Sequence, residues 1–98
     1  MKPLDTVFRM DGFDFQQIDR QGDIATFRKT KGKIESFEVV IVQKNKEFQI
    51  GGKTIPAHES MPRSELWGTA GWSYVSKPDA FERVQRLLDA QNSATAKQ

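Results

Sequence analysis

The sequence predicts an α+β fold: an antiparallel β-meander of four or more strands, a projecting β-hairpin, and one C-terminal α-helix packed on one sheet face. Three observations predict this class. Ile and Val together number twelve against four Leu, a bias typical of strands. Turn signals containing glycine separate short apolar runs along the first half of the chain. One stretch of helical periodicity follows near the C-terminus.

The first hairpin is predicted around Asp11-Gly12, because both residues tolerate the positive φ of a two-residue turn. A turn of this length places Met10 opposite Phe13 and Phe8 opposite Phe15. One face of the first ribbon is therefore expected to be apolar.

The next two turns are predicted as three-residue loops, Arg20–Gly22 and Thr30–Gly32, each with its glycine in the left-handed position of a bulge. These loops pair Phe15 with Phe27 and Ala25 with Phe37. They predict one apolar face, made by Phe8, Met10, Phe13, Phe15, Ala25, Phe27, Phe37, Val39 and Ile41. The opposite face is expected to carry a smaller apolar patch of Ile18, Ile24, Val40 and Val42.

Beyond the meander, Gly51-Gly52 predicts a second tight hairpin between Phe48–Ile50 and Lys53–Ile55, projecting from the sheet as an arm. Residues 56–70 contain two prolines and are expected to form an irregular connection with one helical turn at Ser64–Trp67. A last strand is predicted over 72–75.

The helix is predicted from about Lys77 to Ala90, capped by the Ser76 hydroxyl and favoured by Asp79 in its first turn. Its apolar stripe consists of Ala80, Phe81, Val84, Leu87 and Leu88. We expect this stripe to pack on the face of Phe15, Phe27 and Phe37. Residues 1–90 are thus expected to form a single α+β domain, followed by a polar, disordered tail over 91–98.

Composition bounds the function. A chain of 98 residues with a net charge of +2 holds one modest core. It has no cysteine and one histidine, so we expect no disulfide, no metal site and no cofactor. No run of about 18 apolar residues and no export leader is present, which predicts a cytoplasmic protein without a membrane partner.

Catalysis is not expected. His58-Glu59-Ser60 brings a histidine, a carboxylate and a hydroxyl together in the sequence. A nucleophile needs a base within hydrogen-bond reach and a third group that orients this base, and adjacency along the chain does not provide that geometry. We therefore predict that the protein is not an enzyme.

Positive charge is concentrated at one predicted hairpin, where residues 28–33 contain no acid. The cations are Arg28, Lys29, Lys31 and Lys33. A solvated hairpin tip is one interpretation. The other is a single-stranded nucleic-acid-binding domain, in which these cations contact phosphates and exposed aromatic side chains stack on bases.

The segment Trp67-Gly68-Thr69-Ala70-Gly71-Trp72 is the most distinctive in the sequence. Its indoles either plug the open side of the sheet or anchor a protein partner. We expect Trp72 to pack and Trp67 to stay partly exposed. The predicted partner-binding residues are Trp67, Trp72, Tyr74, Ile18 and Ile24. The principal functional prediction is a small binding module or regulator that acts through a protein partner, in an undetermined oligomeric state.

Four segments also carry a resemblance. These are Phe13–Ile18, Gly22–Ala25, Ser36–Val39 and the glycine-flanked tryptophan segment. Together they resemble small uncharacterised bacteriophage and prophage proteins. The resemblance implies a phage-encoded protein in a bacterial cytoplasm, and it implies no activity and no functional residues.

Overall fold

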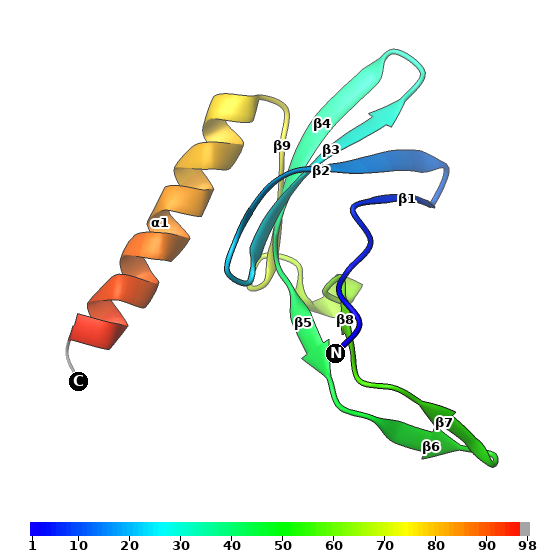
Figure 1. Cartoon of the computed structure of the whole chain (residues 1–98). Helices are drawn as coiled ribbons and strands as arrows, with labels where there is room; N and C mark the ends of the chain where they lie inside the picture. The colour runs from blue at the N-terminus through cyan, green and yellow to red at the C-terminus, as the bar shows by residue number, and fades with distance from the viewer. Residues whose placement is uncertain (97–98) are drawn as a thin grey trace.

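The computed structural model describes residues 1–96 and confirms the α+β prediction (Figure 1). Five antiparallel strands form one sheet in the order β1-β2-β3-β4-β9, so the first four strands are a meander. Their bounds are β1 Val7–Met10, β2 Phe13–Gln21, β3 Ile24–Lys31, β4 Ile34–Ile41 and β9 Gly71–Tyr74.

Two short ribbons extend from the sheet between β4 and β9. Strand β5 (Gln43–Asn45) pairs with β8 (His58–Ser60), and β6 (Phe48–Ile50) pairs with β7 (Lys53–Ile55). Figure 1 shows the β6–β7 hairpin reaching away from the sheet, which confirms the predicted arm. A 3-10 turn, η1 (Ser64–Leu66), precedes β9.

The first hairpin has the predicted register. Met10 pairs with Phe13 and Phe8 with Phe15. Asp11 and Gly12 have φ of 55° and 80°, as a type I′ turn requires. The stacked rings of Phe8 and Phe15 lie with their centroids 4.9 Å apart, so the turn aligns two aromatic side chains on one face.

The next two turns are shorter than predicted. Gln21 pairs with Ile24, and Lys31 pairs with Ile34, so each loop has two residues rather than three. Gly22 and Gly32 occupy the first turn position with φ of 61° and 58°. A glycine at this position is typical of a type II′ turn, whereas the three-residue prediction placed it last in the loop.

The two errors have different consequences. In β2, a bulge between Gln17 and Asp19 adds back the residue that the short turn removes, so Phe15 and Phe27 still share a face. The turn between β3 and β4 has no such compensation. Ala25 therefore pairs with Val40 instead of Phe37, and every side chain of β4 lies on the face opposite to the predicted one.

The sheet consequently has two apolar faces rather than one. The helix-face cluster is Ile24, Phe37, Val39, Ala80 and Val84, with Ile18, Trp72, Tyr74, Phe81, Leu87 and Leu88 packed against it. The open-face cluster is Phe15, Ala25, Phe27, Val40 and Val42, with Leu4, Phe8, Phe13 and Met61 packed against it. The prediction that the helix packs on Phe15 and Phe27 is wrong, because these residues lie on the face away from the helix.

The helix α1 (Lys77–Ala96) begins as predicted, since the backbone N–H of Asp79 donates to Ser76 Oγ at 3.3 Å. It continues beyond the predicted end at Ala90. Residues 91–96 contain no glycine or proline that would stop a helix, and the last turns of α1 include them. Residues 97–98 of the predicted tail lie outside the described residues.

Candidate functional site

A groove of about 650 Å³ lies on the sheet face opposite α1. Strand alternation directs Phe15, Lys29, Glu38 and Ser73 toward this face, and these four side chains, from β2, β3, β4 and β9, form its floor. The rest of the lining comes from the β1–β2 hairpin and from the connection before β9, and includes Met10, Phe13, Pro62, Arg63 and Trp67.

An ion pair occupies the floor of the groove. Glu38 is only 4% exposed, and its Oε1 accepts a hydrogen bond from Lys29 Nζ at 3.0 Å. Lys29 Nζ also lies 4.3 Å from the centroid of the Phe13 ring, so cation–π attraction adds to the ion pair. A buried charge is tolerated when it is paired in this way, and the pairing fixes both side chains in place.

The ion pair has capacity for a further partner. Among the described residues, the Glu38 carboxylate accepts two hydrogen bonds, from Lys29 Nζ and from Ser73 Oγ at 3.5 Å, and both reach Oε1. A ligand that donates to Oε2 would therefore add a contact without displacing one. A few fixed polar groups among apolar walls are typical of binding sites.

Trp67 is held on the wall of the groove by the backbone around it. The backbone N–H of Trp67 donates to Ser64 O at 3.1 Å. The backbone N–H of Gly68, whose φ is 91°, donates to Gly71 O at 2.7 Å. The ring lies directly over Gly71, where an added Cβ would overlap three of its carbon atoms. The indole is thus fixed against β9 and remains 39% exposed.

Trp72 lies on the opposite face of the sheet. It packs in the helix-face cluster, where the guanidinium of Arg83 lies 4.8 Å from its ring centroid. Arg83 Nε donates to the Tyr74 hydroxyl at 2.7 Å, which ties β9 to α1. Trp72 and Tyr74 therefore serve the contact between helix and sheet.

The structure does not bring the predicted partner-binding residues together. Of the five, Trp67 alone lies on the open face. Ile18 and Ile24 were expected on the face opposite the helix, but both belong to the helix-face cluster, and Ile24 is fully buried. The predicted face of Ile18 and Ile24 is wrong. The register of β4 places Phe37 and Val39 on the same face as Ile24, and α1 packs on that face.

The predicted basic hairpin is divided between two faces. Arg28 lies on the helix side of β3 and forms an ion pair with Glu35, whereas Lys29 lies on the open side and pairs with Glu38. Lys31 also lies on the open side, with its Nζ 5.3 Å from the centroid of Phe13. Lys33 lies in the turn between β3 and β4. Two of the four cations thus have carboxylate partners, and the four do not form one surface.

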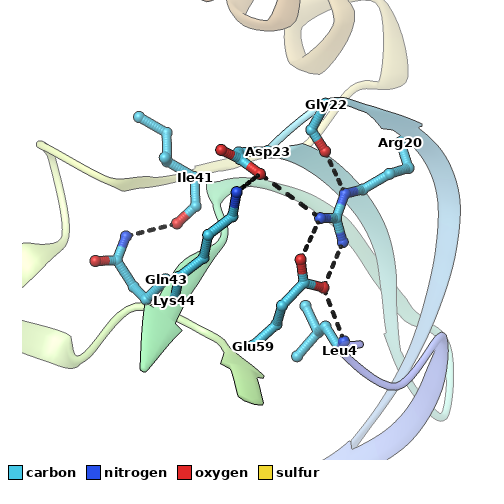
Figure 2. Close-up of polar contacts among 8 residues, drawn as sticks. All are labelled: Leu4, Arg20, Gly22, Asp23, Ile41, Gln43, Lys44 and Glu59. Carbon is cyan, nitrogen blue, oxygen red and sulfur yellow. Dashed lines mark hydrogen bonds and ion pairs between the residues drawn. The ribbon is translucent and has the colours of Figure 1, made fainter. Parts of the chain in front are cut away.

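A second polar cluster joins the N-terminal segment to the body (Figure 2). Arg20 Nη1 and Nη2 donate to Glu59 Oε1 and Oε2 at 3.2 and 2.9 Å, and the N–H of Leu4 donates to Oε1 at 3.0 Å. The hydrogen bonds from Arg20, and then that from Leu4, lower the pKa of Glu59 to about 2. Arg20 Nε also donates to Gly22 O at 2.6 Å, and Lys44 Nζ lies 3.2 Å from Asp23 Oδ1. This cluster fastens the β5–β8 ribbon to the β2–β3 turn.

The triplet His58-Glu59-Ser60 does not converge. Alternation along β8 directs Glu59 to the face opposite its two neighbours. His58 Nδ1 lies 2.9 Å from Pro56 O, and Ser60 Oγ accepts from Asn45 Nδ2 at 2.9 Å. Each of the three groups therefore has a structural partner of its own.

Sequence reasoning missed most of the groove. The one signal available for it was Glu38, a carboxylate between Phe37 and Val39 in an otherwise apolar strand. A charged residue in such a run has to find a partner or a function, and here its partner is the floor cation Lys29.

Comparison with known proteins adds no relative. No protein-family model matches the chain, no curated protein matches it, and no solved structure matches its fold. Within residues 1–96, no helix combines the length and apolar character needed to cross a membrane. In the same range, no three His, Asp or Glu side chains gather closely enough to hold a metal ion.

Proposed function

We propose that this protein is a non-enzymatic binding module that takes a segment of a protein partner in the groove of the open sheet face. The observation that carries the proposal is the fixed, partly exposed indole of Trp67 in the same groove as the ion pair between Lys29 and the buried Glu38. Tryptophan anchors contribute a large share of the energy at protein interfaces, and an anchor that is already fixed loses little entropy on binding.

The charges of the groove favour a protein over a nucleic acid. The floor cation Lys29 is compensated by Glu38, and one further residue of each charge, Asp11 and Arg63, lines the groove. A phosphate backbone laid along the groove would meet these carboxylates as well as the cations. A peptide instead supplies apolar side chains for the walls and amide N–H groups for Glu38 Oε2.

Short linear peptides selected from a random display library would test the proposal. Trp67→Ala should raise the dissociation constant of the selected peptides at least about tenfold. The matched control is Val75→Ala, because Val75 is an exposed apolar side chain that belongs neither to the groove lining nor to the arm. Equal loss in both variants, or none in either, would contradict a groove site.

Single-stranded DNA and RNA oligonucleotides serve as the competing probes. Phosphate contacts weaken steeply as salt rises, with a slope of about 0.7 per contact on single strands, whereas an apolar peptide interface is nearly insensitive to salt. The competing result is tight, salt-dependent binding of an oligonucleotide that is lost when Lys29, Lys31 and Lys33 are all changed to Gln. This result would contradict a protein partner and favour a nucleic acid.

A further inference from the structure

The β6–β7 arm presents two backbone edges to solvent. Gly51 and Gly52 have φ of 55° and 81°, so the arm closes in a two-residue type I′ turn. In such a hairpin the pair beside the turn exchanges hydrogen bonds, and bonded and non-bonded pairs then alternate. Ile50–Lys53 is the pair beside the turn, and Gln49–Thr54 is the next one. The N–H and C=O of Gln49 and of Thr54 therefore point outward, one residue on each edge.

The two edges differ in how they are protected. Strand β7 contains Lys53 and is followed by Pro56, and a charge or a proline at an exposed edge discourages further pairing. Strand β6 is Phe48-Gln49-Ile50, with neither a charge nor a proline. Its Phe48 and Ile50 are 43% and 63% exposed. Strand β6 is thus the edge that is competent to pair.

We propose that β6 pairs antiparallel with β6 of a second copy of this chain, about a twofold axis at Gln49. In this register each outward-facing Gln49 exchanges backbone hydrogen bonds with the partner's Gln49, and Phe48 of each copy lies opposite the partner's Ile50. The two hairpins become a four-stranded sheet. One of its faces carries Phe48, Ile50 and Ile55 of each copy, with Lys53 on the outer strand beside Ile50.

Other twofold registers of β6 are less favourable in this sequence. The axis can lie at a hydrogen-bonded pair (Glu47, Gln49 or Gly51) or at a non-bonded pair (Phe48 or Ile50). An axis at Phe48 sets Ile50 opposite Lys46 of the second copy, and an axis at Ile50 sets Phe48 and Gln49 opposite the turn glycines. An axis at Glu47 sets two carboxylates against each other, and an axis at Gly51 superposes the two turns. The Gln49 register places apolar side chains against apolar ones. A segment complementary to itself under a twofold rotation is what a symmetric dimer requires, and a net charge of only +2 opposes association little.

Sedimentation velocity over a micromolar to millimolar concentration series tests the dimer, with a proline on each edge. At either position proline removes an outward N–H and leaves the hydrogen bonds within the hairpin intact. Gln49→Pro should raise the dimer dissociation constant at least about tenfold, and Thr54→Pro should leave it near that of the wild type. A wild type that stays monomeric throughout, or a dimer lost in Thr54→Pro but kept in Gln49→Pro, would overturn the proposal.

Crosslinking gives a second, independent readout. The chain has no cysteine, so a single introduced thiol reports only on its own position. Directly opposed residues of a hydrogen-bonded pair have Cα atoms about 5.5 Å apart, within the range of a disulfide. Under mild oxidation Gln49→Cys should crosslink into a dimer, and Thr54→Cys should not. Equal crosslinking of the two variants would contradict the twofold axis at Gln49.

Discussion

The lowered pKa of Glu59 predicts how the contribution of this residue to stability depends on pH. Its pKa in the folded protein is lowered from 4.5 to about 2, so its contribution to stability is complete above about 4.5 and is lost as the pH falls toward 2. The difference in melting temperature between wild type and Glu59→Gln should therefore be constant near neutral pH and should shrink between pH 4.5 and 2. Thermal unfolding of both proteins across this range measures it.

The matched control for Glu59 is Glu82→Gln. Glu82 pairs with Arg86 on the exposed surface of α1, where an ion pair contributes little. The control should melt close to the wild type at every pH. If the difference in melting temperature between wild type and Glu59→Gln did not change with pH, the stabilising role of the ionised Glu59 carboxylate would be contradicted.

The contact between Gly71 and Trp67 is a second prediction at the scale of single residues. In Gly71→Ala the new methyl group would overlap the indole, and overpacking of this kind costs about 1–3 kcal/mol. In a Trp67→Ala background the same substitution should cost much less, because the ring that it strikes is gone. Denaturant unfolding of the four proteins in a double-mutant cycle measures the coupling. An equal cost in both backgrounds would contradict the packing of Trp67 on β9.

At the scale of elements, the residues of each turn determine whether the register of the next strand can be predicted from the sequence. The type I′ turn at Asp11-Gly12 was predictable, because both positions need positive φ and both residues accept it. Gly22 and Gly32 suit either the first position of a two-residue turn or the last of a three-residue loop. The choice reverses the side chains of the following strand, so the elements could be predicted but the face carrying Phe37 could not.

The candidate site shows the same limit. Partial exposure of Trp67 followed from its place beside Gly68 in an irregular connection. The groove floor comes from the four strands β2, β3, β4 and β9, and Lys29 and Glu38 meet only when β4 has its observed register. No local signal in the sequence distinguishes that register from the one with a longer loop.

Both faces of the sheet hold part of the core, so a residue of the open-face cluster should be as important for folding as one under the helix. Phe27 is fully buried against Phe8 and Phe15. Phe27→Ala should lower the free energy of unfolding by about 3–5 kcal/mol, a large part of the stability of a small domain. Val75→Ala, at a side chain that is 86% exposed, should change it by less than about 1 kcal/mol. Similar denaturation midpoints for the two variants would contradict the assigned core.

At the scale of the whole molecule, the two faces of the sheet have different surroundings. The helix α1 covers Ile24, Phe37 and Val39 and is tied to β9 through Trp72. The other face keeps a groove with Trp67 on its wall. The two tryptophans, only five positions apart, therefore report separately on the two faces.

Acrylamide quenching of each indole, with the other replaced by Phe, tests this division most directly when it is measured with and without a selected peptide. In Trp72→Phe, the remaining Trp67 should be readily quenched in the free protein and protected by the peptide. In Trp67→Phe, the remaining Trp72 should be shielded by α1 throughout, and the peptide should not change its quenching. Protection of Trp72 by the peptide, or a Trp67 that the peptide leaves equally accessible, would contradict the groove as the binding site.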